Sequence, residues 1–132
     1  MNWFVKDLIF STKHKNLTYL KVESQKQYFD LSLLKTISQL KTLTILNTPI
    51  YNLKKLKSLP EINYLRLENR SLKNANSLRQ LQNIEYLSLQ GNKIHDFSFT
   101  RKMKKLRHLH ISKTSKKCHK IKLPKGVSCS DL

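Results

Sequence analysis

The residue types that carry most enzyme chemistry are scarce and scattered in this sequence. His95 and Asp96 are neighbours, but no nucleophile stands at a spacing that would complete a hydrolytic triad with them. The chain has two glycines, Gly91 and Gly126, which are too few and too far apart for a phosphate-binding loop. The sequence therefore predicts no catalytic residues, no enzymatic activity and no cofactor.

Sulfur and imidazole ligands gather near the C-terminus without forming a known metal motif. Cys118, His119 and Cys129, together with His108 and His110, are soft ligands, but their spacing matches none of the usual zinc patterns. We therefore predict no metal site. Two cysteines so close to one end favour free thiols in a reducing compartment, and the alternative is a bridge between them inside a C-terminal cap.

Positive charge is the strongest compositional feature of the chain. It has 26 Lys and Arg against 8 Asp and Glu, giving a net charge of +18 over 132 residues. Such a field favours an acidic protein, a nucleic acid or an anionic lipid surface as partner. The density is highest over residues 101–125, where we expect side chains to bind phosphate or carboxylate groups. The residues predicted to bind anions are Arg101, Lys102, Lys104, Lys105, Arg107, Lys113, Lys116 and Lys117.

An internal repeat positions these residues. The triplet apolar-x-x-apolar-x-apolar occurs five times, and its starts step by 23, 22, 22 and 22 residues along the chain. Its alternation is typical of a short strand, and later apolar residues at every third position favour a short helix or 3-10 turn. Because each unit alone would leave its apolar side in water, stacked neighbours must form the core. The triplets are Leu17/Leu20/Val22, Leu40/Leu43/Ile45, Ile62/Leu65/Leu67, Ile84/Leu87/Leu89 and Leu106/Leu109/Ile111.

These units resemble leucine-rich repeats, in the 22-residue subclass of the phosphatase-1 regulatory repeat protein and the internalins. Residues 84–94 carry the full pattern L-x-x-L-x-L-x-x-N-x-I, and the resemblance covers about residues 17–114. It implies an α/β solenoid of about five repeats, with parallel strands on a concave face and short helices or 3-10 turns on the convex face. It also implies that Asn92 caps backbone groups inside its turn, whereas Thr48, Arg70 and Thr114 occupy that position elsewhere.

The ends of the repeat array are expected to be caps, which solenoids require. We divide a single domain into an N-terminal cap over 1–16, repeats over 17–114, and a basic C-terminal cap and tail over 115–132. Apolar residues at helical spacing predict an amphipathic helix over 2–10. Ile121 and Leu123 alternate with lysines, which predicts a further short strand that ends at Pro124 and a frayed tail beyond it.

The strand positions between the apolar residues point away from the core and form columns across the repeats. One column contains Tyr19, Thr42, Tyr64, Tyr86 and His108, and the next contains Lys21, Thr44, Arg66, Ser88 and His110. Tyrosine is enriched where proteins bind each other, although it also suits strands for packing reasons alone. The residues predicted to bind a partner are Tyr19, Lys21, Tyr64, Arg66, Tyr86, His108 and His110.

Together these features predict a noncatalytic module that binds an acidic protein through the tyrosine-lined face and the basic C-terminal flank. An adaptor, an inhibitor, an immunity-type protein or a subunit of a larger assembly would fit. The alternative is an RNA-associated protein of a ribonucleoprotein complex, in which residues 101–125 grip phosphates while tyrosines stack on bases. The sequence has no transmembrane segment and no signal peptide pattern. We therefore predict an intracellular, cytoplasmic location and do not expect a membrane partner.

Overall fold

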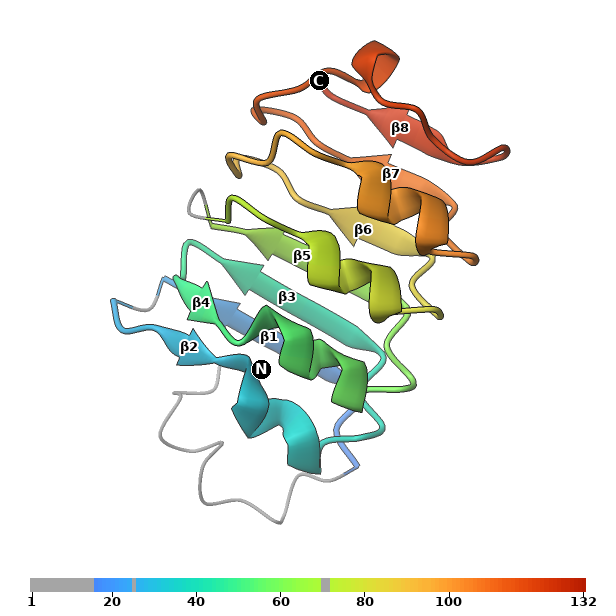
Figure 1. Ribbon diagram of the computed structural model, residues 1–132. Helices are drawn as coiled ribbons and strands as arrows, with labels where there is room; N and C mark the ends of the chain where they lie inside the picture. Colours follow the sequence, from blue (N-terminus) through green and yellow to red (C-terminus); the bar gives the residue numbers. More distant parts are fainter. Residues whose placement is uncertain (1–15, 25, 70–71) are drawn as a thin grey trace.

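The computed structural model describes residues 16–24, 26–69 and 72–132, which form a stack of repeated strand-and-turn units (Figure 1). Six strands lie side by side in one parallel sheet, in the order of the chain. The register aligns Leu20, Leu43, Leu65, Leu87 and Leu109, as the triplets predict. The predicted leucine-rich-repeat solenoid is therefore confirmed. The strands are β1 (Tyr19–Glu23), β3 (Thr42–Leu46), β5 (Tyr64–Glu68), β6 (Tyr86–Ser88), β7 (His108–His110) and β8 (Ser128–Ser130).

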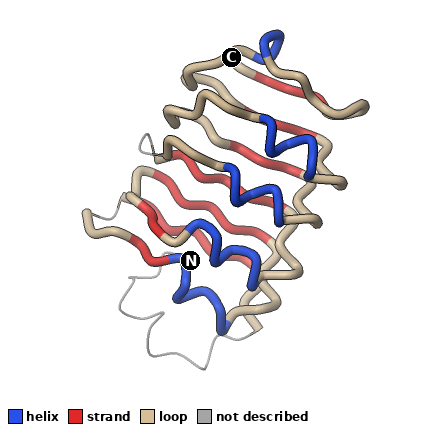
Figure 2. The backbone as a smooth tube through the Cα atoms, viewed as in Figure 1, coloured by secondary structure: helices blue, strands red, loops and turns tan. Residues whose placement is uncertain are grey.

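Short 3-10 helices form the second layer and cover one face of this sheet (Figure 2). Apolar residues at every third position favour the 3-10 form, which has three residues per turn. We call this side of the molecule the helix face and the open side of the sheet the strand face. The helices are η2 (Leu31–Thr36), η3 (Leu53–Ser58), η4 (Asn76–Gln80), η5 (Ser98–Lys102) and η6 (Cys118–Lys120). A small parallel pair that the sequence did not indicate, β2 (Phe29–Asp30) with β4 (Ile50–Tyr51), precedes η2 and η3.

The core lies between the two layers and runs without a break along the stack. Each unit contributes its strand leucines from one side and one or two residues of its 3-10 helix from the other. Leu65, Leu78 and Leu87, for example, have no exposed surface. Full burial of a leucine side chain contributes about 1.5–3 kcal/mol relative to leaving it in water, so every repeat depends on its neighbours.

Asn92 connects adjacent repeats inside the turn that leads from strand to helix. Its amide Nδ2 donates to the carbonyl oxygens of Leu67 and Leu89, and its Oδ1 accepts from the backbone N–H of Leu72. The side chain is 1% exposed, so these bonds replace water that cannot reach the backbone. The role that the resemblance implied for Asn92 is confirmed.

In the other repeats, different side chains form hydrogen bonds with the backbone groups of this turn. Thr48 is fully buried and its hydroxyl donates to the carbonyl of Leu46. Arg70 lies outside the described residues, but its neighbour Asn69 is buried, and Asn69 Oδ1 accepts from the N–H of Leu72. Thr114 instead donates to the carbonyl of Lys116 within its own loop. A shorter or displaced polar side chain therefore replaces the missing asparagines.

Three equivalent positions of the repeat, separated by multiples of 22 residues, adopt a left-handed backbone. Asn47 has φ 47°, Gly91 has φ 78° and Lys113 has φ 57°. Glycine adopts this conformation without steric cost and asparagine with little, whereas a lysine is strained there. The repeat geometry therefore imposes this backbone conformation even where the residue type does not favour it.

The C-terminal end differs from the prediction in three ways. Residues 120–123 form no strand; the sixth strand is β8, and its Cys129 pairs with Leu109 in the register. The tail is not frayed, because β8 is hydrogen-bonded to β7. The cysteines are not free, because Cys118 and Cys129 form a disulfide. The physical reason is shared: Cys129 takes the place of a repeat leucine, while Ile121 and Leu123 pack against the last core layer from the helix side.

The N-terminal helix predicted over 2–10 lies outside the described residues, as does nearly all of the proposed N-terminal cap. Among the residues that are described, no helix is long and apolar enough to cross a membrane.

Candidate functional site

Three aromatic rings stack along the strand face. The sheet register places Tyr64 beside Tyr86 and Tyr86 beside His108, as predicted. The centroids of the Tyr64 and Tyr86 rings are 4.3 Å apart with an interplanar angle of 5°, and those of Tyr86 and His108 are 5.3 Å apart at 14°. Parallel strands lie about 4.8 Å apart, so rings at one register position meet face to face. We call these three residues the aromatic ladder.

Tyr19 belongs to the same column but not to the ladder. Thr42 stands between it and Tyr64 in the register, so no ring contact continues to β1. The Tyr19 side chain is 46% exposed, whereas Tyr64 and Tyr86 are half-buried by their neighbours. Burial of the Tyr86 hydroxyl, with the nearby Tyr64, raises its pKa above the ordinary value of 10.0. The Tyr86 hydroxyl therefore stays protonated at physiological pH.

The sixth strand fixes the C-terminal end of the ladder. The His108 ring bonds through Nδ1 to Ser128 Oγ at 2.6 Å and through Nε2 to Ser130 Oγ at 3.1 Å. These two serines are site residues that sequence reasoning missed, because it placed the last strand elsewhere. The register pairs His108 with Ser128, 20 residues later, so the 22-residue step of the earlier repeats does not locate these serines. Both imidazole nitrogens are therefore engaged within the protein.

The second column of the strand face carries cations that already have acidic partners. Arg66 donates from Nε and a terminal nitrogen to the two carboxylate oxygens of Glu68, each at 3.1 Å, and Ser88 donates to the same carboxylate. This hydrogen-bonded pairing raises the pKa of Arg66. Lys21 Nζ lies 2.7 Å from Glu23 in the same arrangement. The strand face is therefore close to neutral, although the chain as a whole is not.

His110 occupies this second column as predicted, beside Ser88 in the register. Its Nε2 lies 2.9 Å from Ser112 Oγ, and the side chain is half-buried. All seven residues predicted to bind a partner thus lie on one face of the sheet. Their capacity to bind remains a prediction.

The structure distributes the basic segment 101–125 around the end of the solenoid and does not form one patch. Arg101 and Lys102 lie on η5, on the helix face. Lys104, Lys105 and Arg107 precede β7, so they lie at the edge where strands begin; Lys105 contacts Asn83, and Arg107 Nε lies 3.8 Å from Glu85.

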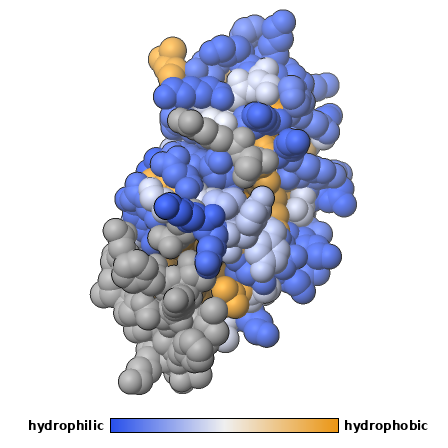
Figure 3. All heavy atoms as spheres, turned by 90° about the vertical axis from the view of Figure 1, so that its left-hand side faces the viewer, coloured by the Kyte–Doolittle hydropathy of each residue, from blue (hydrophilic) through white to orange (hydrophobic). Residues whose placement is uncertain are grey.

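The remaining predicted anion-binding residues lie at the opposite edge, where strands end. Lys113 follows β7 and borders a hollow with Glu68 and Gln90, and Lys116 and Lys117 lie in the next loop. Figure 3 shows this edge: among the residues that it colours, most are hydrophilic, and hydrophobic residues appear as a few small patches. The predicted anion-binding residues therefore lie on the helix face and at two edges, because the chain turns twice within 101–125, and their capacity to bind anions remains a prediction.

The chemistry-bearing residues outside the strand face have structural roles. Asp96 Oδ1 accepts from the backbone N–H of Ser98 at 2.8 Å, and this bond lowers the pKa of Asp96. Both cysteines are in the disulfide, so neither offers a thiolate to a metal. Within the described residues, no group of three or more His, Cys, Asp or Glu side chains is arranged to hold a metal ion.

Comparison with solved structures supports the fold. The chain is similar to an internalin (InlF) from Listeria monocytogenes, with TM-score 0.66 and 20% identity over 74% of this chain and 28% of that one. It is also similar to an internalin C2 from the same species, with TM-score 0.61 and 26% identity over 76% of this chain and 46% of that one. The chain thus spans less than half the length of either protein. No family model and no curated protein matches the sequence.

A parallel sheet, 3-10 helices and a 22-residue step together define a leucine-rich-repeat protein. Its repeats are similar to those of the internalins.

Proposed function

We propose that this chain is a noncatalytic interaction module that binds a protein partner through the aromatic ladder on the strand face. The observation that carries the proposal is the stack of Tyr64, Tyr86 and His108 on the open side of the sheet. Rigid aromatic side chains supply contact area with little loss of conformational entropy, and tyrosines are enriched in binding hot spots. The leucine-rich-repeat fold is consistent with this role.

The partner is proposed to be acidic, but not because of direct pairing across the strand face. Lys21 and Arg66 are already neutralised by Glu23 and Glu68. The net charge of +18 would instead steer an acidic partner towards the module and raise the association rate. An adaptor, an inhibitor, an immunity-type protein or a subunit of an assembly each fits such a role.

The geometry of the ladder makes RNA a weaker candidate. Tyr86 has Tyr64 on one ring face and His108 on the other, so no base can stack on it without opening the ladder. Single-stranded nucleic acids bind by stacking on free aromatic faces above a basic groove. The cations of 101–125 lie at two edges and on the helix face, so they do not form one basic groove above these rings.

The intracellular location also remains a prediction. It was based partly on free cysteines, whereas the disulfide favours an oxidising compartment.

The test is a capture experiment with matched variants, performed with and without nuclease. Immobilised wild-type chain is expected to retain one dominant acidic protein, and Tyr64→Ala with Tyr86→Ala is expected to lose it. The control is Tyr28→Ala with Tyr51→Ala, an exposed tyrosine pair with ring centroids 6.2 Å apart near β2 and β4, not on the strand face. Equal loss in both variants would contradict the proposed site, and loss after nuclease alone would favour RNA.

A further inference from the structure

The helix face carries a column of cations that the strand face does not share. Lys35, Lys57, Arg79 and Arg101 follow one another at steps of 22 residues, so each repeat contributes one. They lie near the ends of η2, η3, η4 and η5, and all four side chains are exposed. Stacking of the repeats therefore brings four positive charges into one row across the 3-10 helices. We call this row the cation row.

Among the described residues, no acid forms an ion pair with the cation row. Asp96 interacts electrostatically with Arg101, but its main partner is the backbone N–H of Ser98. None of η2, η3, η4 and η5 contains an Asp or Glu. The ion pairs found among residues 16–24, 26–69 and 72–132 involve Lys21, Arg66 and Arg107, and none involves a member of the row. Like charges in register repel each other, and on the strand face the same fold neutralises them with a carboxylate two residues later. This contrast favours an external anion as the partner of the row.

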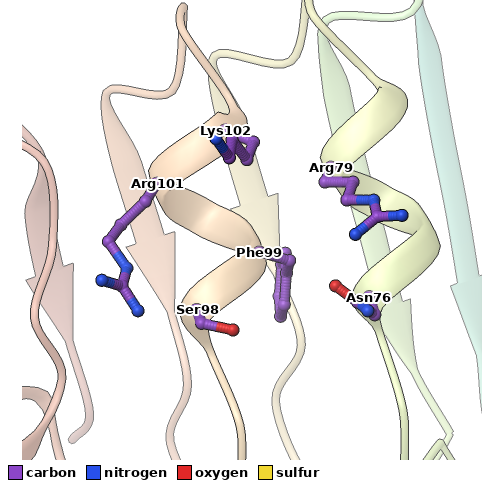
Figure 4. A pocket seen from close by; sticks show the side chains of 6 residues that line it. All are labelled: Asn76, Arg79, Ser98, Phe99, Arg101 and Lys102. Atoms are coloured by element: carbon purple, nitrogen blue, oxygen red, sulfur yellow. The ribbon is translucent and has the colours of Figure 1, made fainter.

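Hollows separate neighbouring members of the row. One of about 410 Å³ lies between η4 and η5 and is lined by Asn76, Arg79, Ser98, Phe99, Arg101 and Lys102. In Figure 4, Phe99 stands between the two helices, with Asn76 and Arg79 on one side and Ser98 and Lys102 on the other. The Arg101 side chain extends along the opposite flank of η5. A chain that crosses the helices would meet Arg79, the hollow and Arg101 in turn.

The lining of this hollow combines three kinds of group. Arg79, Arg101 and Lys102 supply charge, Asn76 and Ser98 supply hydrogen-bonding groups, and the ring of Phe99, 2% exposed, forms an apolar wall. A second hollow of about 490 Å³ continues the row towards η3, between Lys54, Asn76 and Arg79. No carboxylate lines either hollow; Asp96 lines an adjoining one, where it caps Ser98. Volumes of this size admit a sugar ring with its charged substituents.

We propose that the cation row binds a sulfated polysaccharide, whose chain lies across the 3-10 helices. Sulfate groups would pair with the row, and sugar hydroxyls would bond to Asn76 and Ser98 in the hollow between η4 and η5. A single-stranded nucleic acid fits less well, because the hollow presents no exposed aromatic face for a base. The disulfide also favours an oxidising compartment such as the extracellular space.

The experiment measures binding of a size-defined heparin oligosaccharide to the full chain by fluorescence anisotropy at several salt concentrations. The row variant combines Lys35→Gln, Lys57→Gln, Arg79→Gln and Arg101→Gln. The control combines Lys93→Gln, Lys120→Gln, Lys122→Gln and Lys125→Gln, which removes the same charge from exposed positions outside the row. We expect the row variant to weaken binding at least tenfold and to flatten the dependence of log Kd on log salt, and the control to change Kd less than threefold.

Several outcomes would overturn the proposal. Equal losses of heparin affinity in the two variants would show that net charge alone determines binding. A larger loss of affinity in the control would place the ligand outside the row. Tighter binding of a DNA duplex or of phosphatidylserine vesicles than of heparin, in parallel titrations, would assign the row to another polyanion. A desulfated oligosaccharide is expected not to bind. The Tyr64→Ala with Tyr86→Ala variant is expected to keep full heparin binding, which separates this proposal from the one for the strand face.

Discussion

The two faces of this solenoid treat positive charge in opposite ways. On the strand face, Lys21 and Arg66 each have a carboxylate two residues further along the same strand. On the helix face, Lys35, Lys57, Arg79 and Arg101 have none. Residues two apart in a strand point to the same side, so an acid there can pair with the cation. The exposed positions of the 3-10 helices hold only basic and uncharged polar residues. The same repeat thus produces a neutral aromatic surface and a cationic one.

This difference indicates that two kinds of ligand are suited to the two faces. A neutral face with stacked rings gains contact energy by desolvation, which suits a protein surface. A face with uncompensated charge gains by releasing counterions, which suits a polyanion. The predictions below test whether the faces are independent, in order of decreasing effect.

The largest effect is expected where both faces depend on one residue. Asn92→Ala removes a buried amide that bonds to Leu67, Leu89 and Leu72, leaving backbone groups unsatisfied. With about 1–3 kcal/mol for each buried polar group left without a partner, we expect destabilisation by about 3 kcal/mol in urea unfolding. Asn63→Ala, at an exposed position, is the control and should change stability by less than about 0.5 kcal/mol. Similar values for the two variants would contradict the structural role of Asn92.

Removal of the disulfide should act on one end of both faces. Cys118→Ser with Cys129→Ser opens a loop with a sequence separation of 11, and closure of such a loop contributes about 2–3 kcal/mol. Hydrogen exchange should become faster in 118–130 and at His108, which is held by Ser128 and Ser130. Exchange in β3 and β5 should not change. Unchanged exchange throughout, or no loss of stability, would show that the C-terminal cap does not need the bridge.

The N-terminal end of the helix face should respond to acid. Asp30 caps η2 by accepting from the N–H of Ser32, and Asn52 donates to the same oxygen. The bond from Asn52 is the main cause that lowers the pKa of Asp30 from 3.8 to about 2. Because the folded-state pKa is the lower one, the contribution is present above pH 3.8 and is lost as the pH falls through about 2.

Asp30→Ala should therefore cost about 1 kcal/mol at pH 7, as for other N-cap losses. The difference in free energy of unfolding between the variant and the wild type should become smaller below pH 3.8. A difference in free energy of unfolding that stays constant down to pH 2 would mean that the charge of Asp30 does not stabilise the cap.

The smallest effect tests the comparison of the faces directly. Arg66→Gln breaks the bidentate pair with Glu68 and should destabilise the fold by about 0.5 kcal/mol, the usual size for a partly exposed pair. Arg101→Gln removes a cation that forms no salt bridge with any described residue and should leave stability unchanged or slightly higher. Thermal unfolding at low salt distinguishes the stability changes of the two variants. A larger loss for Arg101→Gln would show that the cation row has a structural role.

Much of the strand face could be predicted from residue types and spacing. The 22-residue step of the leucines fixes which side chains share a column, and Tyr64, Tyr86 and His108 lie where that step places them. The sixth strand could not be predicted in the same way, because Cys129 replaces a leucine and Ile121 and Leu123 imitate a strand by alternation. Alternation alone does not distinguish residues that pair in a sheet from those that only cover a core.

The sequence by itself determined the solenoid, its register and its excess of positive charge, because stacked repeats can bury their leucines in only one alignment. Tertiary structure decided how the charges are grouped. It distributed the cations of 101–125 over the helix face and the two edges of the sheet. It also brought together in one row four cations that are far apart in the chain, Lys35, Lys57, Arg79 and Arg101. The reason is that sequence neighbours diverge at every turn of a solenoid, whereas residues one repeat apart become neighbours in space.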